Sequence, residues 1–222
     1  MPPRMAPAKP QRPEFIMLRT IQVALWALAA LGVAGFAYMT WGRGAPSPEV
    51  LAARQATALM NGQADVGGPF SLVDQRGQAF TQANLVGRPT ALFFGFTQCP
   101  DICPSTMALL SAARAELGPA ADRLQVVFVS VDPARDTPDV LKLYAESFSQ
   151  PLVALTGSQQ AVDAMVRAYL AYARYVPLEA GGYTVDHTSF LYLLDDAGQF
   201  VEVLPYGQDP AAVAVRLRAL LD

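Results

Sequence analysis

Apolar and polar residues between positions 69 and 222 follow two kinds of pattern. A continuous apolar run at 90–96 and a mainly apolar one at 125–131 predict strands buried on both faces, because a strand with one exposed face would alternate. Shorter extended segments are expected at 69–73, 79–81, 152–155, 172–176, 189–194 and 200–204. Helical spacing is found at 105–117, 136–148, 158–170 and 209–221. Strands alternate with helices and the last two strands form an antiparallel pair, so we predict an α/β fold with a mixed central sheet.

The segment 20–41 has a different pattern, with 22 consecutive residues and no charged side chain. As a helix with a rise of about 1.5 Å per residue it would be roughly 33 Å long, enough to cross a bilayer. It is longer than the apolar core of a cleaved signal peptide. We therefore expect one N-terminal transmembrane helix ahead of the α/β domain.

The distribution of charge sets the expected orientation of this helix. Four of the 16 basic residues but only one of the 19 acidic residues precede position 20. This favours a cytoplasmic N-terminus and an exported body. We expect a basic tail at 1–19, an anchor at 20–41, a linker at 42–68 and an exported domain at 69–222. The short N-terminus lacks a long Arg- and Ser-rich transit segment, which favours a bacterial plasma membrane with the domain in the periplasm. The alternative is the mitochondrial inner membrane.

The exported body is acidic, with a net charge of −6 beyond residue 19 against −3 for the whole chain. Nucleic-acid binding depends on neutralising phosphates with basic side chains. We therefore expect no nucleic-acid partner.

Both cysteines of the chain, Cys99 and Cys103, lie in the segment FTQCPDICP at 96–104. This segment follows a predicted buried strand, at the sheet edge where functional sites collect. Four-residue spacing places both sulfurs on one side of a helical turn. The neighbouring helix N-terminus favours thiolates, which bind metals and exchange disulfides. A disulfide closing so short a loop would remove little unfolded-state entropy, which argues against a purely structural role.

The single histidine, His187, is flanked by Asp186 and is expected at a strand edge, after an irregular loop with Gly181-Gly182 and just before the strand at 189–194. A lone histidine is by default an ordinary structural group. Two thiolates and one imidazole, however, form a soft ligand set that suits Cu(I) and can hold Cu(II). Asp186 is a candidate for orienting the imidazole. Structural zinc would need a fourth ligand. Spacing alone does not bring His187 to the cysteines.

Four segments together resemble the Sco/SenC family of copper-binding assembly proteins. They are GGPFSLVD at 67–74, GFTQCPDICP at 95–104, SVDPARDTP at 130–138 and VDHTSFLYL at 185–193. The resemblance covers roughly residues 65–221 and implies a thioredoxin-like fold behind one N-terminal anchor. It also implies that Cys99, Cys103 and His187 are copper ligands, with Asp186 as a neighbour of the site.

The resemblance implies a copper metallochaperone that delivers copper to the CuA centre of cytochrome c oxidase. The expected partners are the CuA-bearing oxidase subunit, a copper donor protein, a thiol reductant and the membrane. The alternative is a membrane-anchored thiol–disulfide oxidoreductase that reduces client cysteines before metal loading, with His187 tuning the thiolates. A peroxidase using Thr97 and Arg135 is disfavoured by the paired cysteines. The aspartates of 132–136 fit a turn and a helix cap, and Arg135 is a candidate for contacting a partner or the site loop.

Overall fold

The computed structural model describes residues 22–23, 25–33, 35, 57–61 and 64–222. The chain divides into two units, Met1–Leu51 and Ala52–Asp222. The described residues of the first unit are helical, and no helix within the described ranges is long and apolar enough to cross a membrane. The expected basic tail lies outside the described residues, as do parts of the expected anchor and most of the expected linker.

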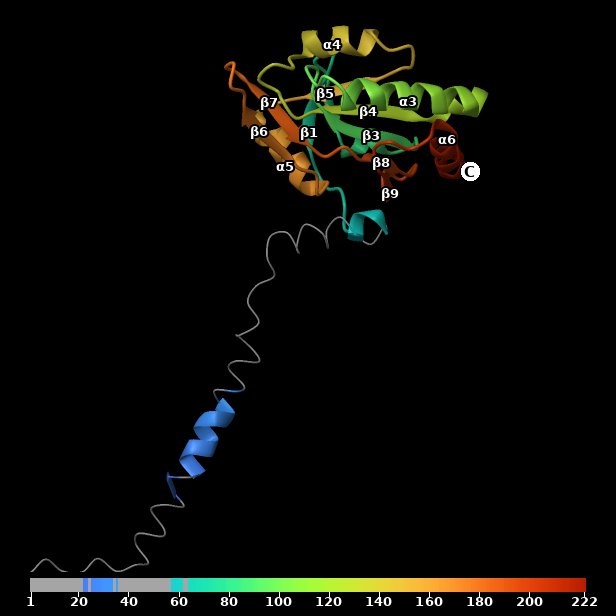
Figure 1. Ribbon diagram of the computed structural model, residues 1–222. Helices are drawn as coiled ribbons and strands as arrows, with labels where there is room; N and C mark the ends of the chain where they lie inside the picture. Colours follow the sequence, from blue (N-terminus) through green and yellow to red (C-terminus); the bar gives the residue numbers. More distant parts are fainter. Residues whose placement is uncertain (1–21, 24, 34, 36–56, 62–63) are drawn as a thin grey trace, which may run out of the picture. The chain divides into compact units, whose positions relative to one another are not determined.

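The second unit is built around a seven-stranded mixed sheet with the strand order β2-β1-β5-β4-β3-β8-β9 (Figure 1). The strands are β1 (Ser71–Asp74), β2 (Ala79–Thr81), β3 (Thr90–Gly95), β4 (Gln125–Ser130), β5 (Val153–Thr156), β8 (Leu191–Leu194) and β9 (Phe200–Leu204). The central strands β3, β4 and β5 are parallel, whereas β1, β2, β8 and β9 pair antiparallel. The predicted mixed sheet and its closing hairpin are confirmed.

Helices cover both faces of this sheet and explain its unbroken apolar strands. The helices are α3 (Ile102–Leu117), α4 (Pro138–Glu146), α5 (Gln159–Ala168) and α6 (Pro210–Leu221), with short 3-10 helices η1 (Gln82–Leu85) and η2 (Gly118–Arg123). Side chains of α3, α4 and α6 pack on the face that includes Phe93 and Phe128. Those of α5 pack on the face that includes Phe94 and Val129. All six residues of β3 are therefore buried, because consecutive strand residues point to opposite faces.

Two local features differ from the sequence-based expectation. Helix α3 begins at Ile102, three residues before the predicted start. Pro104 lies in its first turn, where no intrahelical N–H bond is needed, so the proline does not delay the helix. The second feature is a separate antiparallel hairpin formed by β6 (Ala173–Pro177) and β7 (Tyr183–His187). The sequence predicted an extended segment near β6, but no strand was predicted for the residues that form β7.

Candidate metal centre

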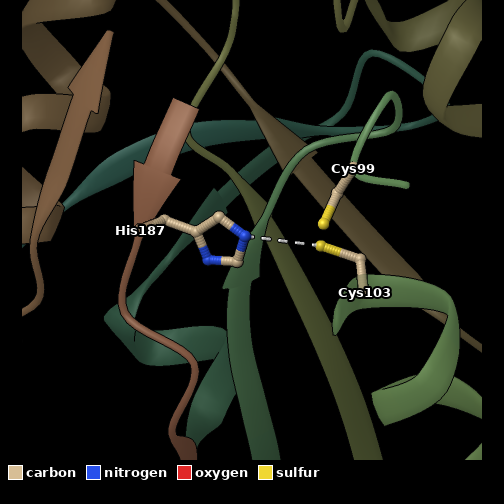
Figure 2. Close-up of side chains that lie close together, drawn as sticks. All are labelled: Cys99, Cys103 and His187. Carbon is tan, nitrogen blue, oxygen red and sulfur yellow. Dashed lines mark hydrogen bonds between the residues drawn. The ribbon is translucent and has the colours of Figure 1, made fainter. Parts of the chain in front are cut away.

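The structure brings together the three side chains that the sequence singled out (Figure 2). Cys99 lies in the loop after β3, Cys103 in the first turn of α3, and His187 is the last residue of β7. Sγ of Cys103 lies 3.7 Å from Nε2 of His187, although 84 positions separate them in the chain. Ligand atoms of all three residues lie within 4.8 Å of one another. The three ligand atoms lie close enough together for one metal ion to bind all of them.

Cys103 can approach the central sheet because β3 ends with a glycine. A Cβ atom on Gly95 would lie 2.6 Å from Sγ of Cys103 and 2.7 Å from Cε2 of Phe128. Carbon and sulfur atoms do not approach so closely without displacement. The absence of a side chain at Gly95 therefore makes room for the buried sulfur, a requirement that the sequence pattern did not reveal.

Asp136 anchors the loop that carries Cys99. Its fully buried carboxylate accepts hydrogen bonds from the Thr97 N–H (3.0 Å) and hydroxyl (2.6 Å), and from the Ser130 hydroxyl (2.6 Å). Burial raises the pKa of Asp136, although these donors act in the opposite direction. The cap of α4 is Thr137 rather than Asp136. This anchor was not predicted from the sequence, where its one signal is the position of Asp136 after a buried strand, at the same sheet edge as the cysteines.

The imidazole of His187 is oriented with Nε2 toward the sulfurs. Its Nδ1 lies 3.0 Å from the carbonyl oxygen of Thr188. A carbonyl oxygen only accepts, so Nδ1 carries the proton and Nε2 keeps the lone pair that a metal needs. The ring also packs edge-to-face against Phe93 and Phe96, with centroids 5.9 and 5.7 Å away. The carboxylate of Asp186 points to Arg174, at 3.0 Å, and the contact to Nδ1 comes from Thr188.

The two sulfurs have different acidities because they share one proton. A hydrogen bond from Cys103 lowers the pKa of Cys99 to about 4, with help from backbone N–H groups, while burial acts against it. The same hydrogen bond, together with burial, raises the pKa of the Cys103 thiol. The backbone N–H of Asp101 stabilises the Cys99 thiolate, and its carboxylate accepts from the Ser105 hydroxyl at 3.1 Å. At neutral pH the pair therefore consists of a half-buried thiolate and a buried thiol.

A hollow of about 400 Å³ leads to the site. It is lined by Phe96, Cys99, Pro100, Asp101, Ile102, Thr184, Val185, Asp186 and His187. Cys99 and His187 are both in this lining, so a ligand on another molecule can reach them, whereas Cys103 lies behind them. The donor set of two sulfurs and one imidazole nitrogen fits a soft metal ion such as Cu(I). The same dithiol is also competent for disulfide exchange.

This fold and this site define a thioredoxin-like protein in which two thiols and one imidazole share a pocket at the edge of the central sheet. The SCO1/SenC family model matches residues 58–222. The chain belongs to this family.

Relatives come from mitochondria and bacteria. Mitochondrial SCO2 of Saccharomyces cerevisiae is 36% identical over 215 residues, covering 93% of this chain and 70% of SCO2. SenC of Rhodobacter capsulatus is 34% identical over 173 residues, covering 77% and 76%. The chain spans about half (51%) of yeast mitochondrial SCO1.

Solved structures share the fold. The copper-bound structure of Bradyrhizobium japonicum ScoI is 41% identical with a TM-score of 0.65, covering 70% of this chain and 99% of ScoI. BsSco, described as a member of the Sco family of cytochrome c oxidase assembly proteins with a disulfide switch, is 22% identical with a TM-score of 0.54, covering 69% and 92%. At that identity BsSco supports the fold alone.

Proposed function

We propose that this chain binds copper through Cys99, Cys103 and His187 and delivers it to the CuA centre of cytochrome c oxidase. The observation that carries the proposal is the convergence of two sulfurs and one imidazole nitrogen within 4.8 Å. Soft sulfur ligands select Cu(I), and the nitrogen makes the set suitable for Cu(II) as well. Copper is bound in the related ScoI structure, and delivery to the CuA centre is what the resemblance to the Sco/SenC family implies.

Each of the three residues has a distinct part in holding this cargo. Cys99 offers a preformed thiolate, and Cys103 becomes a second thiolate by releasing its proton. His187 supplies the Nε2 lone pair, because Thr188 holds the Nδ1 proton. The hollow beside Cys99 and His187 admits ligands of a partner. Copper then passes to the partner by ligand exchange, without a covalent intermediate.

The remaining parts of the proposal concern where the protein works. Residues 20–41 anchor it in a bacterial plasma membrane, with the tail 1–19 in the cytoplasm and a linker at 42–68 leading to the periplasmic domain 69–222. The uncharged run supports the anchor, and the bacterial relative supports the compartment. The mitochondrial inner membrane is the alternative, supported by the yeast relatives. The partners are the CuA-bearing subunit, a copper donor and a thiol reductant.

A titration with metal-specific spectroscopy tests the ligand assignment. The reduced full-length chain in detergent is titrated with Cu(I) against a competing chelator, and we expect one equivalent to bind. X-ray absorption should then report two sulfur ligands and one nitrogen ligand. Replacing His187 by Ala should remove the nitrogen ligand and weaken the affinity for copper by roughly 10- to 100-fold. Losses of this size are typical when residues that support a metal site are mutated. Full retention by that variant would remove His187 from the ligand set.

A second function, thiol–disulfide reductase, is favoured by the unequal acidity of the two cysteines. The Cys99 thiolate attacks a client disulfide, forms a mixed disulfide and releases one client thiolate. Cys103 then loses its proton and attacks the sulfur of Cys99, which releases the second client thiolate. Two electrons pass to the client, and the chain ends with a Cys99–Cys103 disulfide. If His187→Ala leaves copper binding intact but changes the exchange rate with a disulfide peptide, this reading replaces the first.

A further inference from the structure

The hairpin that carries His187 stands apart from the main sheet. Among the described strands, β6 and β7 pair only with each other. An isolated two-stranded hairpin is marginally stable in water. The position of His187 therefore depends on what holds this hairpin against the rest of the domain.

Part of that support comes from the loop 131–136, which follows β4. The hydroxyl of Tyr175 donates to the carbonyl oxygen of Val131 at 3.0 Å. The hydroxyl of Tyr183 donates to the buried carboxylate of Asp132 at 2.9 Å. One tyrosine from each strand of the hairpin thus reaches this loop.

A single guanidinium connects this loop to the two segments that carry the half-buried site residues Cys99 and His187. Nε of Arg135 donates to the Asp132 carboxylate. Nη1 donates to the carbonyl oxygen of Tyr183 at 3.0 Å and to the side chain of Gln98, the neighbour of Cys99, at 3.1 Å. The guanidinium also lies 3.9 Å from the centre of the Tyr183 ring. Three segments far apart in the chain therefore meet at Arg135.

We propose that Arg135 is a positioning residue, which docks the β6–β7 hairpin against the Cys99 loop and so holds His187 over the two cysteines. This inference rests on the proposed copper function. Tyr183 and His187 are the two ends of β7, roughly 13 Å apart along a strand. Releasing the Tyr183 end lets the short hairpin pivot and carries the imidazole away from the sulfurs.

The cysteines depend on Arg135 less, because it reaches their loop only through the side chain of Gln98. Asp136 holds the start of their loop through Thr97, and Cys103 belongs to helix α3. Loss of Arg135 should therefore convert a three-ligand site into a two-thiolate site. Cu(I) accepts two soft thiolates, whereas Cu(II) favours additional nitrogen or oxygen ligands. Loss of Arg135 should therefore lower the affinity for Cu(II) more than the affinity for Cu(I).

The test compares Arg135→Gln and Arg135→Lys with Arg88→Gln in the full-length reduced chain. Arg88 is a matched control, because its guanidinium also bridges segments, donating to carbonyl groups of Asp122, Arg123 and Leu124. Lysine keeps the charge of Arg135 but lacks the planar fork that reaches several acceptors at once. Both Arg135 variants should therefore behave alike.

The first readout needs no metal. Amide hydrogen exchange in β6 and β7 should become at least about tenfold faster in both Arg135 variants, while exchange in β3 and α3 stays at the wild-type rate. Arg88→Gln should leave the hairpin unchanged. If the Arg135 variants exchange like Arg88→Gln, the inference is wrong, whether or not the protein binds copper.

The second readout uses copper salts as the probe. Cu(II) affinity should fall about tenfold or more in the Arg135 variants, with loss of the imidazole nitrogen coupling in electron paramagnetic resonance, as in His187→Ala. Cu(I) affinity should change much less.

A loosened hairpin with unchanged Cu(II) coupling would overturn the positioning role. Absence of copper binding by the wild type would contradict the proposed function, while hydrogen exchange still decides the docking. If Arg135→Gln does not fold, Tyr183→Phe, which removes the bond to Asp132, should show the same changes more weakly.

Discussion

At the scale of single residues, the site depends on how one proton is shared between two sulfurs. Cys99 is half-buried and Cys103 is buried. The hydrogen bond between them lowers the pKa of the first and raises that of the second. The two cysteines therefore differ in their chemistry: Cys99 is an accessible thiolate, and Cys103 is a buried thiol that keeps its proton. Their four-residue spacing is visible in the sequence, but the difference in burial is not.

This difference predicts the pH dependence of thiol alkylation. Because the pKa of Cys99 is about 4, its thiolate is fully formed above about pH 6, whereas an ordinary cysteine has a pKa of about 8.5. Iodoacetamide should modify Cys99 at a rate that is nearly constant between about pH 6 and pH 8 and that falls only toward pH 4. In Cys103→Ala the hydrogen bond is lost, so the midpoint should rise. Mass spectrometry of timed reactions measures both rates, and a wild-type midpoint near 8.5 would contradict the assignment.

Gly95 gives a second residue-scale prediction. A methyl group there would crowd Sγ of Cys103 at 2.6 Å, so Gly95→Ala should lower the free energy of unfolding by about 1–3 kcal/mol and weaken Cu(I) binding. Gly157→Ala is the matched control, because its Cβ would crowd Cδ2 of Leu72 at 2.9 Å, a contact outside the site. Urea unfolding and copper competition separate the two effects. Equal copper affinity in both variants would show that Gly95 does not shape the site.

At the scale of elements, the site forms where two strands of the main sheet and one strand of the separate hairpin end close together. Strand β3 leads into the Cys99 loop, strand β4 leads into the loop containing Asp136, and β7 ends at His187. Because β3 and β4 are parallel, the loops that follow them lie side by side. This arrangement lets Asp136 accept hydrogen bonds from Thr97 in the neighbouring loop.

The buried carboxylate of Asp136 predicts a pH-dependent stability. Burial raises its pKa above the usual value, so the folded state holds this proton more tightly than the unfolded state. Its contribution to stability is therefore present below the ordinary aspartate pKa of about 3.9 and is lost as pH rises through the folded pKa. Asp136→Asn lacks this titration. The stability difference, wild type minus variant, should become smaller as pH rises above about 4, and a difference that grows would contradict the raised pKa.

At the scale of the whole molecule, copper binding should act as a cross-link. The two cysteines lie in one continuous segment, but His187 comes from a hairpin 84 positions away in the chain, and no disulfide links that hairpin to the cysteines. An ion that binds only the folded chain stabilises it by mass action, by about 4 kcal/mol at a free concentration 1,000 times the dissociation constant. Cu(I) should therefore raise the melting temperature of the domain, and a strong chelator should return it to the metal-free value.

His187→Ala and Arg88→Gln together test this whole-molecule effect. Without His187 the hairpin is no longer linked to the cysteines, so the increase in melting temperature should be smaller than in the wild type. Arg88→Gln should change the metal-free melting temperature but keep the full increase on adding Cu(I). Calorimetry with and without Cu(I) provides the comparison. Equal increases in all three proteins would show that the hairpin takes no part in binding.

Much of the fold was predictable because burial leaves a periodic signal. The apolar runs of β3 and β4 and the stripes of α3 and α6 reflect local geometry, and the structure confirms these elements. Strand β7 was missed because its five residues, YTVDH, follow a Gly-Gly turn and include several polar side chains. The start of α3 was predicted three residues late, at residue 105, because the prediction rested on the helical spacing of the apolar residues from there on.

The sequence by itself determined the chemical inventory: two thiols at helical spacing after a buried strand, one imidazole, and an acidic α/β body behind an uncharged segment. These features are local, so they can be read from neighbouring residues. Only the tertiary structure decided that His187 meets Cys103, that Thr188 directs the imidazole, and that Gly95, Asp136 and Arg135 support the arrangement. Such contacts depend on how distant segments pack around a common sheet edge, which no local periodicity encodes.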